Sequence, residues 1–211
     1  MTVSGKIPTP TFQIEAGLIE RSLGPVCGVD EAGRGPWSGP VVAAAVILDV
    51  GNIPGGINDS KKLSPRRRDE IFNAIRQTSH VGVGIVDVGD IDRLNILQAT
   101  FLAMRSAVAS LEFSPAIALI DGTGKPGLAC EMQTLIKGDQ RSLSIAAASI
   151  IAKVTRDRIM ADLALQFPHY GWERNKGYGT QAHRAGLASH GVTIHHRRSF
   201  KPIKALLQAH S

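Results

Sequence analysis

Apolar residues along the chain fall into two patterns, short continuous runs typical of buried strands and spacings of three or four typical of helices. Continuous runs at 26–30 and 41–48 are separated by a Gly- and Pro-rich segment and predict two strands joined as a hairpin. The second run is apolar enough to be buried on both faces. Further strands are predicted at 81–88, 116–120 and 132–136.

Helices are predicted after the second, third and fifth of these runs. Ser64 followed by Pro65 is typical of a helix N-terminus and predicts a helix to about residue 78. An Ala- and Ile-rich segment predicts a long helix over 144–167. Between them, apolar residues at intervals of three and four predict an amphipathic helix that packs on a sheet through Leu94, Leu97, Phe101, Met104, Val108 and Leu111. Strands alternating with helices predict an α/β fold with a mixed sheet and helical cover.

Length and composition limit the class of protein. With 211 residues, of which 43% are hydrophobic, the chain can bury one solid core. No apolar run approaches the roughly 18 residues needed to span a bilayer, and residues 1–25 contain no continuous hydrophobic segment of the kind found in secretion signals. We therefore expect a cytoplasmic protein without a membrane partner.

Positive charge is unevenly distributed. The net charge is +6, and residues 174–211 contain seven Lys or Arg and no acid. A second basic cluster consists of Lys61, Lys62 and residues 66–68. Two cationic regions on one globular protein indicate a polyanionic partner such as nucleic acid, although ordinary solvated surface charge is the alternative.

Acidic residues follow the predicted strands. Asp30 and Glu31 end the first strand, ahead of a Gly-rich turn, and Asp121 ends the strand at 116–120. Asp139 follows a third apolar run and precedes the long helix. Ligands gather at the carboxyl ends of strands in α/β sheets, so these four carboxylates are candidates for one site. Oxygen donors without nearby Cys or His favour Mg²⁺ or Mn²⁺, and such a site beside cationic surfaces is typical of two-metal phosphodiester hydrolysis.

Each acid also has a simpler explanation. Asp121 with Gly122 resembles a turn, and Asp139 could begin the following helix. Asp157 is a rival fourth carboxylate, but it lies between two arginines inside the long helix, where acids are mostly solvated ion-pair surface. We rank it below Asp139.

Seven ordered motifs resemble bacterial ribonuclease HII over about residues 25–202. They are DEAGRGP at 30–36, NDSKKLS at 58–64, LIDG at 119–122, KGD at 137–139, AAASIIAK at 146–153, KGYGT at 176–180 and HRRSF at 196–200. The resemblance implies a ribonuclease H-like fold with a central five-stranded mixed sheet, flanking helices and a small C-terminal helical region. It divides the chain into an N-terminal extension (1–24), a catalytic core (25–167) and a basic substrate-binding region of the same domain (168–211).

The activity implied by the resemblance is endonucleolytic. A protein of this family would hydrolyse the RNA strand of RNA/DNA hybrids and incise 5′ to single ribonucleotides in duplex DNA, leaving 3′-hydroxyl and 5′-phosphate ends. Asp30, Glu31, Asp121 and Asp139 match its four catalytic acids, and the first three match its metal ligands. We expect two Mg²⁺ or Mn²⁺ ions with substrate bound, and a monomeric protein.

Other residues match substrate contacts of the family. Gly33, Arg34 and Gly35 match the loop that recognises the ribose 2′-hydroxyl, which is the group that distinguishes RNA from DNA. Tyr178 matches the tyrosine that stacks on the deoxyribose after the ribonucleotide; its simpler explanation is a half-buried core aromatic. Positions that contact phosphate are matched by Ser60 and Lys61.

Two features leave alternatives open. Arg197 and Arg198 either contact the nucleic-acid backbone or hold the C-terminal region on the core. Trp37 and Ser38 stand where the family often has a leucine and a small residue, a departure that we expect to alter the wall of the site.

Two other functions are weaker. A non-catalytic nucleic-acid-binding protein on the same fold has no reason to point four acids at a polyanion, since they repel phosphate unless neutralised. A nucleotide-binding phosphotransferase is disfavoured because the sequence has no GxxxxGK[ST] phosphate loop.

Overall fold

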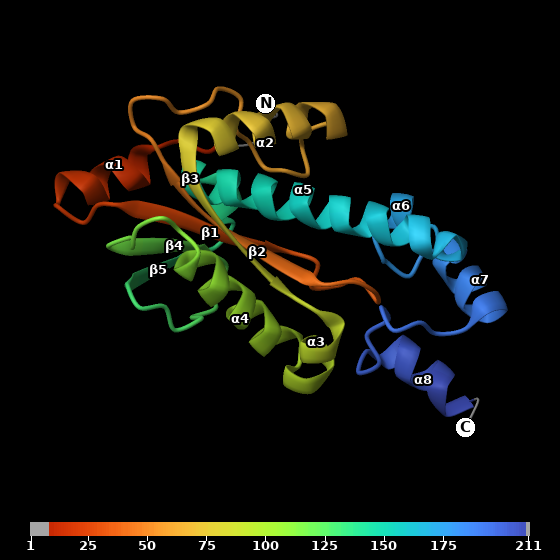
Figure 1. Cartoon of the computed structure of the whole chain (residues 1–211). Helices are drawn as coiled ribbons and strands as arrows, with labels where there is room; N and C mark the ends of the chain where they lie inside the picture. Colours follow the sequence, from red (N-terminus) through yellow and green to blue (C-terminus); the bar gives the residue numbers. More distant parts are fainter. Residues whose placement is uncertain (1–8, 210–211) are drawn as a thin grey trace, which may run out of the picture.

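A computed structural model describes residues 9–209. Five strands form one sheet in the order β3-β2-β1-β4-β5, and helices cover both faces (Figure 1). The strands are β1 (Val26–Ala32), β2 (Val41–Leu48), β3 (Ser79–Val86), β4 (Ile117–Asp121) and β5 (Glu131–Leu135). β1 pairs antiparallel with β2 and parallel with β4, so the predicted hairpin and mixed sheet are confirmed.

The third strand begins and ends two residues earlier than predicted. It covers 79–86 rather than 81–88, because Asp87 caps a helix that the sequence analysis missed, α3 (Val88–Leu94). The Asp87 side chain accepts a hydrogen bond from the Asp90 amide at 3.0 Å. Such a cap ends the strand, and the apolar residue Val88 begins the helix rather than completing the strand.

The helix predicted from the Leu94–Leu111 stripe is shorter, and its predicted buried face is confirmed in part, because Met104 is buried and Phe101 and Val108 pack against the core. α4 (Ile96–Ala109) is separated from α3 by Asn95 at φ 70°. Its buried face consists mainly of small residues, Ala99, Ala103 and Ala107, whereas Leu97 is 43% exposed. The reason is a close approach to β3: a Cβ atom at Gly84 would overlap the carbonyl oxygen of Ala103.

The other face of the sheet is covered by α2 (Pro65–Thr78) and the long α5 (Leu143–Gln166). Ser64 caps α2 through the Arg67 amide, and Ser142 caps α5 through the Ile145 amide, close to the predicted bounds of both helices. Alanines of α5 pack directly on β1 and β2. At Gly28 of β1 a Cβ atom would overlap the Ser144 backbone, so α5 is fixed tightly against the strand that carries the first two acids.

The remaining elements lie around this core. At the N-terminal side, α1 (Gln13–Glu20) packs Leu18 against the sheet. Single 3-10 turns, η1 (Gly138–Gln140) and η2 (Pro168–Tyr170), flank α5. The C-terminal helices α6 (Trp172–Asn175), α7 (Gln181–His190) and α8 (Lys201–Ala209) gather around the buried Trp172 at the far end of α5 (Figure 1).

The N-terminal extension and the absence of a membrane span were both expected from the sequence. Residues 1–8 of the expected N-terminal extension lie outside the described residues. Among residues 9–209, none of the helices combines the length and apolar character needed to cross a bilayer.

The close packing of α4 on β3 gives a direct prediction. Gly84→Ala forces a methyl group into the α4 backbone and should lower the free energy of unfolding by about 1–3 kcal/mol, measured by urea denaturation. Gly17→Ala is the matched control, because its Cβ atom meets nothing within 4 Å. In helix α1 that control should instead stabilise the protein by about 0.5–1 kcal/mol. Equal effects of the two substitutions would contradict the packing account.

Candidate active site

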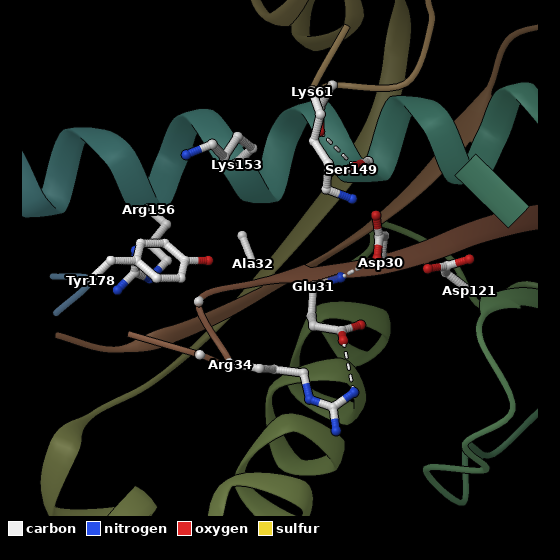
Figure 2. A pocket seen from close by; sticks show the side chains of 13 residues that line it. Asp30, Glu31, Ala32, Arg34, Lys61, Asp121, Ser149, Lys153, Arg156 and Tyr178 are labelled. Carbon is white, nitrogen blue, oxygen red and sulfur yellow. Dashed lines mark hydrogen bonds and ion pairs between the residues drawn. The ribbon is translucent and has the colours of Figure 1, made fainter. Parts of the chain in front are cut away.

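Strand pairing brings the predicted acids to one edge of the sheet. Val29 of β1 is paired with Ile120 of β4, so Asp30 and Asp121, the next residues of two parallel strands, are neighbours. Side chains alternate along a strand, so Asp30 and Glu31 point to opposite sides of β1. Figure 2 shows Asp30 on the α5 side and Glu31 on the α4 side.

Backbone amides fix two of the carboxylates. The Glu31 amide donates to Asp30 Oδ1 at 2.7 Å, and the Gly138 amide donates to Asp121 Oδ1 at 2.7 Å. Asp139 follows Gly138 in η1, and its Oδ2 lies 3.8 Å from Lys61 Nζ. Asp139 thus lies next in sequence to the glycine whose amide binds Asp121, and it also lies near Lys61.

Burial and mutual repulsion make this group of acids electrostatically unfavourable. Burial raises the pKa of Asp30 well above its usual value, and the charges of Glu31 and Asp121 raise it further. The pKa of Glu31 is raised by burial, against the opposing effect of Arg34, whose Nη1 lies 3.2 Å from Glu31 Oε1. Burial also raises the pKa of Asp139, with Asp121 adding to the shift.

Lys61 offsets part of the negative charge. Burial lowers its pKa, but Asp139 and Asp30 oppose this effect and the pKa is raised overall. The oxygen donors of Asp30, Glu31 and Asp121 fit a hard divalent cation, which would relieve their repulsion. Within residues 9–209, no three His, Cys, Asp or Glu side chains already lie close enough together to form a set of metal ligands. The donor chemistry fits Mg²⁺ or Mn²⁺, and a bound ion would have to draw the carboxylates together.

The acids open into a cavity of about 410 Å³. All the predicted metal ligands and substrate-binding residues line it. Asp139 does not line it, but it lies close to Lys61, which does. The lining residues are Asp30, Glu31, Ala32, Gly33, Arg34, Gly35, Ser60, Lys61, Asp121, Ser149, Lys153, Arg156 and Tyr178.

Three polar lining residues were not predicted as site residues. Ser149, Lys153 and Arg156 lie on one face of α5, at intervals of four and three. Ser149 Oγ is 3.0 Å from Ser60 Oγ, and a hydrogen bond from Ser149 lowers the pKa of Asp30 against the larger raising effects. The signal was present in the sequence, because a polar stripe at helical spacing in an alanine-rich helix indicates a face that is not simply core.

Two buried arginines hold the loop that follows β1. Arg197 donates to the carbonyl oxygens of Gly33 at 2.6 Å, Arg34 at 3.0 Å and Gly39 at 2.9 Å. Burial lowers the pKa of Arg197 to about 9, which still leaves it charged at neutral pH. Of the two roles considered for this residue, the structure supports the one that holds the C-terminal region on the core.

Arg156 fixes the other side of the same loop. Its guanidinium donates to the carbonyl oxygens of Ser38 at 3.0 Å, Pro40 at 2.9 Å and Lys176 at 2.9 Å. Gly33 has φ +99°, and a Cβ atom there would overlap the Arg156 side chain. Only glycine fits this position, and the loop is held rigidly beside the acids.

Tyr178 and Trp37 occupy different surroundings. Tyr178 is 51% exposed and lines the cavity, so it is not a core aromatic (Figure 2). Trp37 was expected to alter the wall of the site, but it does not line the cavity; its ring packs against Gly179, where a Cβ atom would overlap it. Ser38 is fully buried, with Oγ 3.3 Å from His183 Nε2.

A second hollow of about 240 Å³ continues from the acids toward α4. It shares Glu31, Arg34 and Asp121 with the larger cavity, and Leu97 and Phe101 contribute apolar surface to it. The carboxylates therefore lie between two hollows, one on each side.

Asp157 belongs to a different set of contacts. Lys153 Nζ donates to it at 2.6 Å, and Arg68 Nη1 lies 4.0 Å away. It lines neither hollow.

The basic cluster near residue 61 is largely engaged within the protein. Arg66 and Arg67 pair with Glu70, and Arg68 donates to the Ser60 and Leu63 carbonyl oxygens. Lys61 differs, because it is the residue of this cluster that lines the cavity, and its side chain is exposed. Lys61 is thus the member of this cluster best placed to meet a bound anion.

Comparisons with known proteins agree on one family. Residues 27–203 match the sequence profile of the family described as Ribonuclease HII. A curated Ribonuclease HII of Magnetococcus marinus is 57% identical over 205 residues, covering 95% of this chain and 96% of that protein.

Solved structures support the same fold. The crystal structure of ribonuclease H2 from Pyrococcus horikoshii OT3 superposes with a TM-score of 0.76 at 27% identity, covering 87% of this chain and 97% of that one. Bst-RNase HIII, solved in complex with Mn²⁺, superposes with a TM-score of 0.73 at 24% identity, covering 91% of this chain and 72% of that one.

Repulsion among the acids predicts a stabilising substitution. Because the raised pKa of Asp30 means that its charged form is unfavourable in the folded state, Asp30→Asn should raise the free energy of unfolding by about 1 kcal/mol in EDTA at neutral pH. Because the raised pKa also means that folded Asp30 binds a proton at a higher pH than unfolded Asp30, this gain in stability of Asp30→Asn over wild type should shrink as the pH falls through the raised pKa.

Urea denaturation measures both effects. Asp69→Asn is the control, since Asp69 is an exposed residue paired with Arg158 and its loss should change stability by less than about 0.5 kcal/mol. A less stable Asp30→Asn protein under chelating conditions would show that the acids are not mutually repulsive.

Proposed function

The chain belongs to the ribonuclease HII family of metal-dependent endoribonucleases, and we propose that its cavity cleaves RNA where it is joined to or paired with DNA. The substrates proposed are the RNA strand of RNA/DNA hybrids and single ribonucleotides embedded in duplex DNA, incised on their 5′ side to leave 3′-hydroxyl and 5′-phosphate ends. The observation that carries this proposal is the gathering of Asp30, Glu31 and Asp121 beside a rigid glycine loop in one cavity.

Asp30, Glu31 and Asp121 are the proposed ligands of two Mg²⁺ or Mn²⁺ ions. The related Bst-RNase HIII was solved with Mn²⁺, which supports an ion of this class. When bound, such ions activate water for attack on a phosphodiester and stabilise the departing oxygen. The protein itself orients two of the carboxylates through the Glu31 and Gly138 amides, and Lys61 is placed to bring positive charge to a bound phosphate and to Asp139.

Recognition of the ribose is assigned to the loop at Gly33, Arg34 and Gly35. Arg197 occupies the carbonyl oxygens of Gly33 and Arg34, so the peptide units of this loop have a fixed orientation before substrate binds. A fixed backbone without side chains at two of three positions can approach a sugar closely and form hydrogen bonds with its 2′-hydroxyl. A flexible loop would lose more conformational entropy on binding.

Tyr178, Ser60 and Lys61 are proposed to contact the nucleotides next to the ribose. Tyr178 presents a half-exposed ring at the cavity rim, as needed to stack on the following deoxyribose. Ser60 and Lys61 line the same cavity and are proposed to contact phosphate. A phosphodiester at the acids has a nucleotide on each side, and the two hollows provide space for both.

We propose that one chain suffices and that residues 25–167 supply the catalytic acids while 168–211 complete substrate binding through Tyr178. The proposed acids, the glycine loop and Tyr178 line one cavity within a single chain, so the proposed site needs no residue from a second copy. We place the protein in the cytoplasm, with the DNA on which it would act. A non-catalytic binding protein on this fold is disfavoured, because the acids at the centre of the cavity repel phosphate unless cations neutralise them.

The proposed function predicts the effect of removing one charge. Asp121→Asn keeps an oxygen acceptor for the Gly138 amide, so the fold should persist, but one anionic metal ligand is lost. Loss of this ligand should remove several kcal/mol of transition-state stabilisation. The cleavage rate on an RNA/DNA hybrid in Mg²⁺ should therefore fall by about a thousandfold or more.

Asp157→Asn is the matched control. It removes the rival carboxylate, which lies outside both hollows, and should leave the cleavage rate within about threefold of wild type. Circular dichroism verifies that both variants are folded. Normal turnover by Asp121→Asn would show that Asp121 has no role in catalysis.

A further inference from the structure

A chain of buried hydrogen bonds lies behind Tyr178. It runs from Thr193 through His196 and His183 to the Tyr178 carbonyl oxygen, and Trp172 and Ser38 join it at His183. Both histidines are fully buried. Neither was singled out as a site residue from the sequence, and neither lines the cavity.

The donors in this chain determine where the protons lie. The Thr193 amide donates to His196 Nδ1 at 3.0 Å, so that nitrogen is an acceptor and the proton of a neutral ring lies on Nε2. His196 Nε2 then donates to His183 Nε2 at 3.0 Å. Trp172 Nε1, which can only donate, also reaches His183 Nε2, at 3.2 Å.

His183 is therefore left with one arrangement. Its Nε2 accepts, so the proton lies on Nδ1 and is donated to the Tyr178 carbonyl oxygen at 3.0 Å. Burial lowers the pKa of His183, and it lowers the pKa of His196 to about 3. Both rings are neutral at neutral pH, as this arrangement of protons requires.

The effect of the chain is to fix the backbone of Tyr178 while its ring stays free. The Tyr178 carbonyl also accepts from the Thr180 amide at 2.8 Å, and the Tyr178 amide donates to the Asn175 carbonyl at 2.9 Å. The ring itself is half exposed at the cavity rim. Hydrogen bonds from a rigid buried region thus set where the ring stands without occupying its surface.

We propose that His183 is a positioning residue that sets the preference of the protein for RNA–DNA junctions by holding Tyr178 through its Nδ1–H group. This inference rests on the proposed function, in which Tyr178 stacks on the deoxyribose after the ribonucleotide. His183 does not touch the substrate. His183 holds the Tyr178 ring in position before the deoxyribose binds, and this reduces the conformational entropy lost on binding.

A purely structural role for His183 predicts a different outcome, and two substitutions separate the two roles. The amide nitrogen of Asn is as many bonds from Cα as His Nδ1, so His183→Asn can still donate to Tyr178 but no longer reaches Trp172. Gln places its amide where His Nε2 lies, so His183→Gln keeps a partner for Trp172 but has no donor at Nδ1. If His183 positions Tyr178, His183→Asn should keep more of the junction preference than His183→Gln. If His183 only fills the core, His183→Gln should keep more, because Gln is closer in volume to His.

The experiment compares kcat/KM on two substrates, a DNA duplex with one ribonucleotide and a uniform RNA/DNA hybrid. We expect the ratio of the two values to stay within about twofold of wild type in His183→Asn and to fall about tenfold in His183→Gln, the effect of about one buried hydrogen bond. Tyr178→Ala should lower the ratio as well, and adding His183→Gln to it should lower the ratio no further, because the histidine acts through the tyrosine.

A second measurement does not depend on activity. Imidazole ¹⁵N NMR of the wild-type protein should show the proton of His183 on Nδ1 and that of His196 on Nε2. If His183 carries its proton on Nε2, if Gln preserves the ratio better than Asn, or if all variants slow both substrates equally, the proposal is overturned. A wild-type protein that cleaves neither substrate would instead refute the proposed function, while the NMR result would still decide the hydrogen-bond arrangement.

Discussion

Repulsion among carboxylates held at one edge of a sheet is the constraint on which the rest of the structure depends. Strand pairing sets Asp30 beside Asp121, and burial raises the pKa of Asp30, Glu31 and Asp139. Arg34 and Lys61 compensate part of the negative charge. The packing of α5 on Gly28 keeps β1 from shifting to relieve the strain. A divalent cation would remove the remaining repulsion, so the same feature that destabilises the protein alone would give it affinity for metal, as is common where activity and stability conflict.

The proposed substrate recognition relies on the opposite arrangement, in which positive charge is buried among neutral acceptors. Arg156 and Arg197 direct their guanidinium groups at backbone carbonyls of the loop between β1 and β2. These bonds join residues more than a hundred positions apart, so the C-terminal region and the loop form one rigid unit. The histidine chain extends this unit to Tyr178. The proposed ribose recognition and junction reading would thus share one buried scaffold, which lies next to the acids but contributes none of them.

Much of the fold, and the grouping of the acids, followed from local sequence signals, whereas the proposed substrate contacts came from the resemblance to ribonuclease HII. The apolar runs predicted β1 and β2, Ser64 predicted the start of α2, and the acids lay at strand ends where ligands bind. The apolar stripe predicted only part of the buried face of α4; it did not predict the alanines at its centre, which are buried because Gly84 lets the helix approach closely. The roles of Arg156 and His183 were also missed, since their partners come from distant segments. Ser149, Lys153 and Arg156 did leave a signal, a polar stripe on an alanine-rich helix.

The central claim is that these acids direct water, through divalent ions, to the phosphodiester on the 5′ side of a ribonucleotide. Incubation with a DNA duplex carrying one internal ribonucleotide, with the product ends mapped, tests it most directly. We predict one incision 5′ to the ribonucleotide, with 3′-hydroxyl and 5′-phosphate ends, in Mg²⁺ or Mn²⁺ and none in EDTA. Cleavage that persists in EDTA, or that leaves a 2′,3′-cyclic phosphate through attack by the ribose 2′-hydroxyl, would contradict the account.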